Sequence, residues 1–169
     1  MINLNSIAQT ARHVPIQMTK REDTIELPYS ARQMFDLVSD IERYPEFLPY
    51  CTGLRILKKS ESPTGLEYLA QMLVQYKVFR EQFKCRVEAN KDADVIEVHF
   101  VEGPIKRLYN HWQFEDVGEK GSITHFTIDF EFSNFLLQTA SNAAFDKAYS
   151  VLSNAFIARA HALYQEKIS

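Results

Sequence analysis

The sequence predicts an α+β fold in which a curved antiparallel sheet of about seven strands surrounds a long C-terminal helix. Two observations predict it. Hydrophobic and polar residues alternate in short runs through most of the chain, which is typical of strands with one buried face. From about residue 134 to 167 the hydrophobic period changes to 3.6, which is typical of one helix of about 30 residues, roughly 45 Å long.

The composition fits one ordinary globular domain. A chain of 169 residues, 46% of them hydrophobic, can bury a stable core without disulfides or structural metal ions. The net charge of −3 argues against a broad nucleic-acid-binding surface but leaves room for a local basic patch. Cys51 and Cys85 lack CxxC spacing and metal-like neighbours, so we expect two buried, reduced thiols rather than a disulfide. No stretch approaches the roughly 18 apolar residues of a transmembrane helix.

The first part of the chain differs from the rest. Residues 1–21 contain three basic residues and several Ser, Thr and Gln residues, but no acid. This composition resembles a weak transit peptide, and the alternative is a frayed N-terminal extension. We favour the extension, disordered or targeting, and place it at residues 1–20, with the folded domain at 21–169.

A short strand and a short helix open the domain. Residues 23–27 alternate as a strand, with Ile25 and Leu27 facing inward. Ser30 and Gln33 have the S-x-x-Q spacing of a capping box, which predicts that a helix begins there. One side of this helix is expected to carry Met34, Phe35, Leu37, Val38 and Ile41.

An elbow with the sequence YPEFLPYC, residues 44–51, ends the short helix. Pro45 and Pro49 fix φ and disfavour the helical conformation of the residue before them, so the chain must turn. Aromatic residues on such an elbow are either part of the core or one wall of an apolar pocket. The sequence alone leaves both interpretations open.

Six further strands follow, and each has one apolar face and one polar face. The segments SPTG (62–65) and DVGEKG (116–121) are interpreted as hairpin turns. The segment GPIKRL (103–108) is interpreted as a turn with Lys106 and Arg107 at its tip. The strands are predicted at residues 54–59, 66–77, 81–90, 95–101, 108–115 and 122–132.

The closing helix has two apolar stripes, and together they raise the question of a cavity. A row of small residues opposite a concave sheet either lets the backbones approach closely or leaves space for a ligand. The inward strand faces offer apolar groups with Asn110, Tyr68 and Tyr76 as polar exceptions, which suits a ligand held by burial. The bulky stripe is Phe145, Tyr149, Leu152, Phe156 and Leu163, and the small stripe is Ala140, Ala144, Ala148, Ala155 and Ala162.

Catalytic and metal-binding patterns are weak in this sequence. It contains no GxSxG, HExxH, P-loop or GxGxxG motif, so we expect no catalytic residues. His99, His111 and His125 point outward from consecutive strands, but their spacing matches no known ligand pattern. We therefore interpret them as an ordinary polar sheet face and expect no metal.

Three segments together resemble the coenzyme Q-binding START-like family, which has the helix-grip fold of the polyketide cyclase/lipid-transport superfamily. They are YPEFLPYC after the helix QMFDLVSDIE, then GPIKRLYNHWQF, then DFEFSNFLL. The resemblance runs from about Lys20 to Gln165. Family members often have tryptophan at the position of Tyr50 and phenylalanine at that of Ile105, and both changes keep an apolar character.

The resemblance implies a non-enzymatic protein with a hydrophobic cavity for ubiquinone or a related isoprenoid lipid, and with no required cofactor. Mitochondrial members of the family support respiratory electron transfer and quinone synthesis. Some bacterial members are instead ribosome-association toxins, which bind the large ribosomal subunit and inhibit translation. We expect the quinone-binding role, because the chain is mildly acidic and its basic residues are scattered.

The expected sites follow from this interpretation. Lys106 and Arg107 are expected to contact anionic head groups or phosphates. Phe135 and Leu136 form either an apolar membrane-contacting tip or ordinary helix-start packing. We expect peripheral contact with the cytoplasmic side of the inner membrane, with the mitochondrial matrix side as the alternative, and the sequence leaves the oligomeric state open. The expected ligand-binding residues are Tyr44, Phe47, Leu48, Trp112, Phe114, Phe130 and Phe132.

Overall fold

A computed structural model describes residues 19–76, 78–132 and 135–165, with the side chains of residues 19, 79, 132 and 135–144 left undescribed. Seven antiparallel strands form one sheet, in the order β1-β7-β6-β5-β4-β3-β2. This confirms the predicted sheet. The strands are β1 (Thr19–Leu27), β2 (Cys51–Ser62), β3 (Gly65–Tyr76), β4 (Phe79–Asn90), β5 (Val95–Glu102), β6 (Ile105–Val117) and β7 (Gly121–Phe132).

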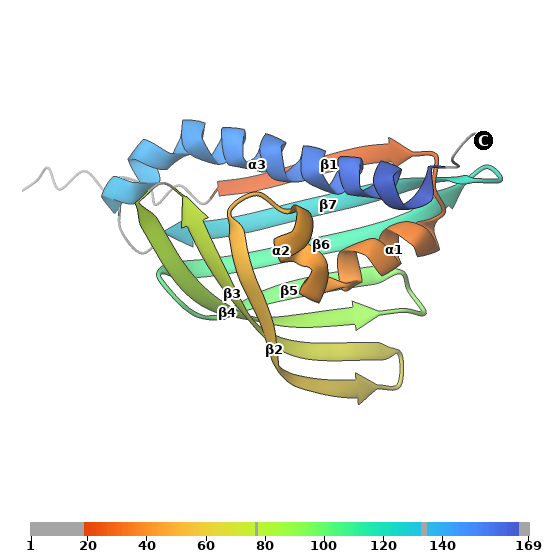
Figure 1. The fold of residues 1–169 in the computed structure, drawn as a ribbon, viewed down its shortest axis with the longest axis horizontal. Coiled ribbons are helices and arrows are strands. Elements are labelled where there is room, and N and C mark those ends of the chain that lie inside the picture. The colour runs from red at the N-terminus through yellow and green to blue at the C-terminus, as the bar shows by residue number, and fades with distance from the viewer. Residues whose placement is uncertain (1–18, 77, 133–134, 166–169) are drawn as a thin grey trace, which may run out of the picture.

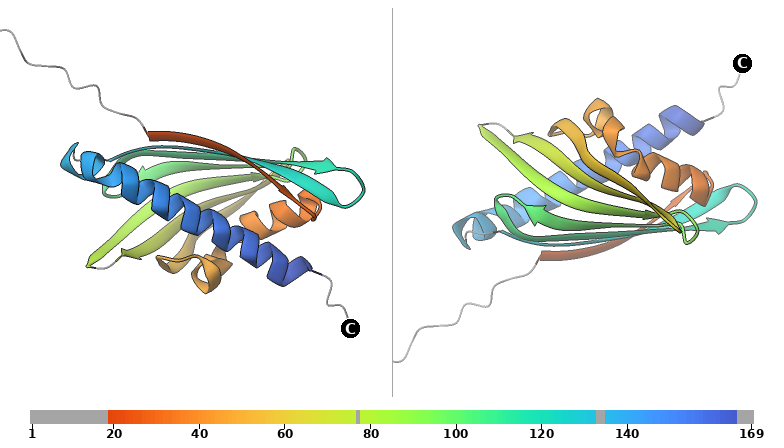
Figure 2. Two further views of the ribbon diagram at one scale, coloured as in Figure 1. Left: turned by 90° about the horizontal axis from the view of Figure 1, so that it is seen from above. Right: turned by 90° about the horizontal axis from the view of Figure 1, so that it is seen from below.

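All helices lie on the same side of the curved sheet (Figure 1). The long helix α3 (Phe135–Tyr164) crosses the concave face diagonally, as the views from above and below show (Figure 2). The helical excursion between the first two strands, α1 (Ala31–Ser39), η1 (Ile41–Arg43) and α2 (Tyr44–Phe47), packs beside the C-terminal half of α3. The predicted arrangement of a sheet around a long helix is therefore confirmed.

Short turns explain why β2 to β7 follow one another across the sheet. A Cβ atom at Gly65 would lie 1.9 Å from the carbonyl oxygen of Ala89, so this end of β3 requires glycine. The N-terminal strand β1 pairs with β7, the last strand in sequence. This pairing places β1 beside the long helix that follows β7 (Figure 1).

The helix α1 begins as its sequence predicts. The hydroxyl of Ser30 accepts a hydrogen bond from the backbone N–H of Gln33 at 3.2 Å, and the Gln33 side chain accepts one from the N–H of Ser30 at 2.9 Å. Asp116, in β6, accepts a further hydrogen bond from the N–H of Ala31 at 2.7 Å. The predicted apolar side of the helix is buried, and it forms the core together with Leu27, Ile96, Phe114 and Ala160.

Two local predictions were wrong. Tyr44, the residue before Pro45, is helical although the proline was expected to disfavour this, because Tyr44–Phe47 form the short helix α2 and proline is well tolerated in a first helical turn. The turn before β6 is shorter than predicted, so Lys106 and Arg107 lie in the strand, next to an irregularity in its pairing with β7. The chain reverses at Tyr50 with φ 70°, a conformation uncommon for a residue other than glycine.

The bulky stripe of α3 faces the sheet over most of its described length. Leu163 is the exception, with 49% of its surface exposed. At the C-terminal end, Ala160 is completely buried and lets α3 approach the core closely. Ala162, which the predicted small stripe includes, is exposed, and Ala140 and Ala144 lie outside the described side chains. At this end of the helix, close packing is therefore the correct interpretation.

Both cysteines are free and buried, as expected. Burial raises the pKa of the Cys85 thiol to about 12 and also raises that of Cys51. Neither thiol is therefore activated for chemistry. In the described ranges, no helix is long and apolar enough to cross a membrane.

Candidate ligand-binding site

A continuous series of aromatic rings lies between the sheet and α3, and we call it the aromatic wall. Phe156 of α3 is at its centre, with ring centroids 5.4 Å from both Tyr44 and Phe47 and 5.3 Å from Trp112. The elbow, the sheet and the long helix thus meet at one side chain. The wall consists of Tyr44, Phe47, Trp112, Phe126, Phe130, Phe145, Tyr149 and Phe156.

The wall continues toward the N-terminal half of α3. The ring of Trp112 lies 4.1 Å from that of Phe126, its cross-strand partner on β7. Phe126 stacks against Tyr149 at 5.8 Å, and Phe130 contacts Phe145 at 4.5 Å. Aromatic pairs at such distances add attraction beyond the apolar area that they bury.

The structure brings four predicted ligand-binding residues into this wall, namely Tyr44, Phe47, Trp112 and Phe130. Phe114 stacks on Trp112 at 6.4 Å, but its edge contact with Phe35 places it in the core beside α1. Leu48 is buried, but its aliphatic side chain contributes no ring to the wall. The predicted residues Phe132, Phe135 and Leu136 lie outside the described side chains.

Four members of the wall were missing from the predicted ligand-binding residues, although the sequence carried a signal for each. Phe126 alternates with Phe130 on the inward face of β7. Phe145, Tyr149 and Phe156 belong to the bulky stripe of the long helix. Combining both patterns would have found them.

The hydroxyl groups of the wall are occupied by partners within the protein. Tyr44 donates to the carbonyl oxygen of Val38, and burial raises its pKa. Tyr149 donates to Asp23 at 2.8 Å, and burial and this hydrogen bond raise its pKa. Both phenols therefore stay protonated at neutral pH and hold the wall in place.

A charged cluster borders the wall at the edge strand β1. The guanidinium of Arg21 lies 4.0 Å from the centroid of the Tyr149 ring and forms an ion pair with Asp146 at 2.9 Å. Together with the hydrogen bond from Tyr149 to Asp23, these contacts attach β1 to α3. This cluster could not be predicted from the sequence, since charged residues at inward positions of a strand carry no periodic signal.

Asn110 is the polar exception on the inner face of β6. It lies between Val98 of β5 and Ile128 of β7 in the sheet. Its side-chain oxygen is buried and has no hydrogen-bond partner among the residues that the structure describes. A buried acceptor without a partner costs about 1–3 kcal/mol, so this position favours a ligand or water that donates a hydrogen bond.

Lys106 and Arg107 form ion pairs with acids on β7. Lys106 Nζ lies 2.6 Å from Oε1 of Glu131, and Arg107 Nη2 lies 2.9 Å from Oδ1 of Asp129. The Glu131 side chain is 9% exposed, so Lys106 neutralises a buried carboxylate. The predicted contact of both bases with anionic head groups stays a prediction, and it would compete with these pairs.

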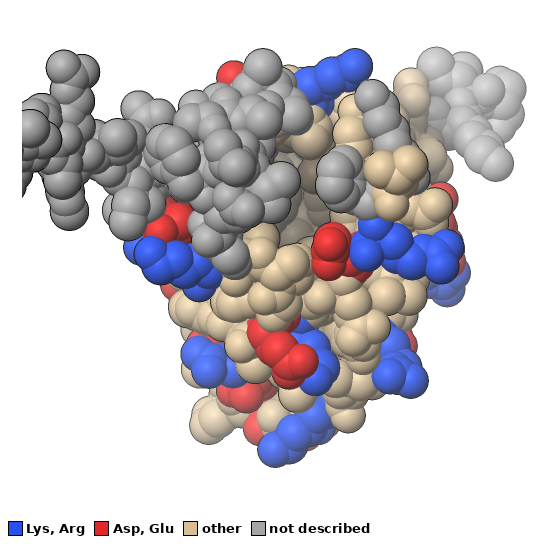
Figure 3. Space-filling model, turned by 90° about the vertical axis from the view of Figure 1, so that its left-hand side faces the viewer, with Lys and Arg blue, Asp and Glu red and all other residues tan. Residues whose placement is uncertain are grey.

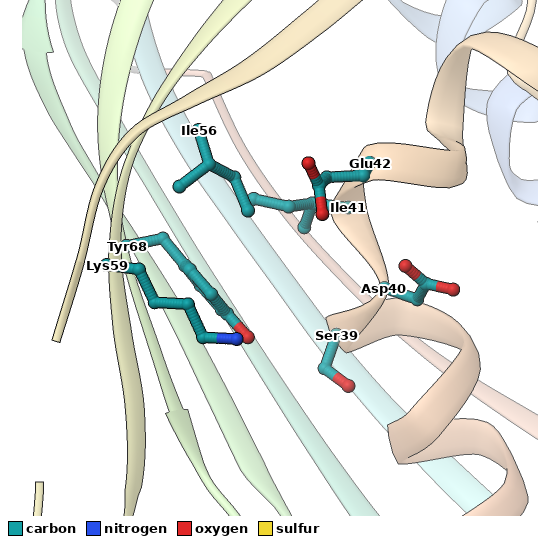
Figure 4. Close-up of a pocket in the computed structure, with 7 residues that line it drawn as sticks. All are labelled: Ser39, Asp40, Ile41, Glu42, Ile56, Lys59 and Tyr68. Atoms are coloured by element: carbon teal, nitrogen blue, oxygen red, sulfur yellow. The ribbon is translucent and has the colours of Figure 1, made fainter. Parts of the chain in front are cut away.

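A small cavity opens elsewhere, between the end of α1 and the sheet (Figure 4). Its volume is about 230 Å³, and it contains Tyr68, one of the polar groups expected on the inner strand faces, but none of the seven predicted ligand-binding residues. Lys59 extends over the ring of Tyr68, at 5.6 Å from the centroid. Burial, followed by the charges of Asp40 and Glu42, raises the pKa of Tyr68. The lining consists of Ser39, Asp40, Ile41, Glu42, Ile56, Lys59 and Tyr68.

The end of the molecule where α3 begins is hollowed (Figure 3). On the described part of this face, acidic and basic side chains are interspersed rather than gathered by sign (Figure 3). Such a face lacks the continuous basic surface that is typical of nucleic-acid-binding proteins.

A curved antiparallel sheet around a long helix, with an apolar wall between them, defines a START-like α+β fold. The family model described as polyketide cyclase / dehydrase and lipid transport matches residues 27–157. The chain therefore belongs to this family.

Two kinds of curated relative match this chain. A ribosome association toxin, RatA, of Escherichia coli is 34% identical over 152 residues, which are 90% of this chain and 93% of that protein. The mitochondrial coenzyme Q-binding protein COQ10 of Dictyostelium discoideum is 26% identical over 162 residues, which are 95% of this chain and 78% of that protein. Sequence similarity thus connects the chain with both names, and more closely with the toxin.

Solved structures show the same fold. The 18 kDa protein CC1736 of Caulobacter crescentus has a TM-score of 0.74 and 36% identity, covering 88% of this chain and all of that chain. A START superfamily protein of Mycobacterium smegmatis has a TM-score of 0.73 at 19% identity. The match covers 85% of this chain and 98% of that chain. The aromatase/cyclase Zhui of Streptomyces has a TM-score of 0.76 at 14% identity, and the match covers 90% of this chain and 100% of that chain. At this low identity, the similarity shows a shared fold alone.

Proposed function

We propose that the chain binds an isoprenoid lipid of the ubiquinone class against the aromatic wall. The observation that carries the proposal is the wall itself, to which α2, β6, β7 and α3 all contribute rings. Each Å² of apolar ligand surface buried there contributes about 25 cal/mol. The hollow at the beginning of α3 would admit the ligand (Figure 3).

We propose that this binding involves no catalysis and no resident cofactor, although the fold is shared with an aromatase/cyclase. The described side chains of the wall are hydrocarbon, phenol or, at Trp112, indole, which does not titrate near neutral pH. The two phenols, Tyr44 and Tyr149, already donate to partners within the protein. A general acid or base would need a free group of suitable pKa within reach of the ligand.

The oxygen of Asn110 suits one form of this ligand. A quinol or prenyl alcohol carries a hydroxyl that can donate to this oxygen, whereas an oxidised quinone carries acceptors alone. We therefore propose that the reduced form binds more tightly. In the cell, the protein would support respiratory electron transfer and quinone synthesis at the inner membrane, on its cytoplasmic side or, in a mitochondrion, on the matrix side.

The single tryptophan of the chain, Trp112, lies in the wall and provides the test. A short-chain ubiquinol should quench its fluorescence saturably, and Asn110→Leu should weaken the binding about fivefold, since one hydrogen bond is worth about 1 kcal/mol. Asn154→Leu, at an exposed position of α3, is the matched control. Absence of saturable quenching in folded protein would contradict the assignment of the wall.

The second candidate function is association with the large ribosomal subunit, which the similarity to the RatA toxin supports. We expect Lys106→Gln/Arg107→Gln to reduce co-sedimentation with large subunits at low salt. Glutamine is chosen because an acid there would lie beside the buried Glu131. Lys120→Gln, in an exposed turn, serves as the control. If the unmodified protein stays in the supernatant at low salt, this candidate is wrong.

A further inference from the structure

We propose that the outer face of the sheet binds a divalent transition-metal ion of the zinc class between Glu88, Glu97 and His99. One ligand atom from each of these residues lies within 4.8 Å of the other two. Glu88 of β4 lies directly opposite Glu97 of β5, and His99 is two residues further along β5. The three side chains therefore share one face of two hydrogen-bonded strands.

The carboxylate of Glu97 is already oriented for this role. One oxygen, Oε1, accepts a hydrogen bond from the hydroxyl of Tyr109 at 2.8 Å and faces Nδ1 of His111 at 3.2 Å. The other oxygen, Oε2, lies 3.8 Å from Nε2 of His99. Metal-binding carboxylates are commonly held by such hydrogen bonds to their second oxygen, so Tyr109 and His111 act as positioning residues.

The spacing of the ligand atoms suits a small divalent ion. A tetrahedral ion with bonds of about 2.0–2.2 Å separates its ligand atoms by about 3.4 Å. The distance between Glu97 Oε2 and His99 Nε2 needs little change to reach that value. Imidazole together with carboxylate favours zinc, copper or nickel over magnesium and calcium, which prefer oxygen ligands.

The charges of the cluster favour a cation. Two carboxylates directly opposite each other on neighbouring strands repel, and an ion between them removes this repulsion. Arg86 offsets part of it, since its Nε lies 2.8 Å from Oε1 of Glu88. Oε2 of Glu88 forms no ion pair or hydrogen bond with the residues that the structure describes, so it is the oxygen that would face the ion. His125 is not part of the cluster, because it lies beside Glu115 and two residues away from His111 in the register.

The spacing of His99, His111 and His125 in the sequence predicts an ordinary polar face, because these three residues alone match no ligand pattern. The structure changes the set of candidate ligands. It adds Glu88 and Glu97 and leaves His125 out, a combination that depends on the register of β4, β5 and β6.

Titration of the full chain with zinc chloride against a chromogenic zinc chelator tests the proposal. We expect one equivalent of zinc to bind, and His99→Ala and Glu88→Gln each to weaken the affinity at least tenfold. His125→Ala, on the same face but outside the cluster, should bind as the unmodified protein does. Circular dichroism would verify that each variant is folded.

Two results would overturn this site. One is the absence of a saturable equivalent of zinc in the unmodified protein. The other is equal zinc affinity of the unmodified protein and the folded His99→Ala and Glu88→Gln variants, which would assign the bound zinc to other residues.

Discussion

Trp112 and Phe156 determine how the sheet and the long helix meet. Their rings lie 5.3 Å apart, and Phe156 also contacts both aromatic rings of α2. Removing one of these side chains would leave a void, because its neighbours are attached to three separate elements. At the residue scale, the candidate site therefore depends on the same contacts that hold the fold together.

Strand and helix periods in the sequence are sufficient to identify most of the wall. Alternation places Trp112 and Phe130 on inward faces, and the helical stripe contains Phe156. The same periods fail for Arg21 and Asp23, which are polar residues at inward positions. Their contacts with Tyr149 depend on where α3 crosses β1, which no local pattern specifies.

The two thiols provide a prediction at this scale. Burial raises the pKa of Cys85 to about 12 and that of Cys51 in the same direction, so little thiolate is present at pH 8. We expect both thiols to react slowly with a disulfide reagent in the folded protein and completely in denaturant. Rapid reaction of either thiol without unfolding would contradict the burial described for it.

At the scale of elements, local signals and pairing differ in how well they can be predicted. The start of α1 follows from Ser30 and Gln33 because a capping box involves neighbouring residues alone. The positions of Lys106 and Arg107 depend instead on how β6 pairs with β7, including the irregularity between Ile105 and Arg107. Such cross-strand relations combine distant segments, so the sequence predicted a turn where the strand begins.

The capping box allows a quantitative prediction. Ser30→Ala removes the acceptor for the N–H of Gln33, so the free energy of unfolding should fall by about 1 kcal/mol. Urea denaturation would measure it, with Ser60→Ala at an exposed strand position as the control. Equal losses in both variants would show that the cap does not stabilise α1.

At the scale of the whole molecule, the order of elements predicts the architecture. One strand, a helical excursion, six strands in a meander and a closing helix can bury their apolar faces if the sheet curves around that helix. The amount of space left between them was not predictable. It depends on side-chain packing, which is close at Ala160, whereas the opposite end of the molecule is hollowed (Figure 3).

The fold is compatible with both functions for which relatives of this chain are named. A lipid-binding role requires the apolar wall and an opening to it, whereas a ribosome-binding role requires an outer surface complementary to RNA or ribosomal protein. The wall is a specific feature of the described structure. The basic residues proposed for the surface, Lys106 and Arg107, are paired with acids of the same sheet.

Mass spectrometry of an organic extract from gently purified protein tests the central claim most directly, with the Trp112→Glu variant analysed beside it. We predict a near-stoichiometric quinol or prenyl lipid in the unmodified protein and none in the variant, because a charge in the wall cannot be buried without a partner. An extract without lipid from folded, unmodified protein would contradict lipid binding and favour the ribosome. Equal lipid in both proteins would show that the ligand lies elsewhere.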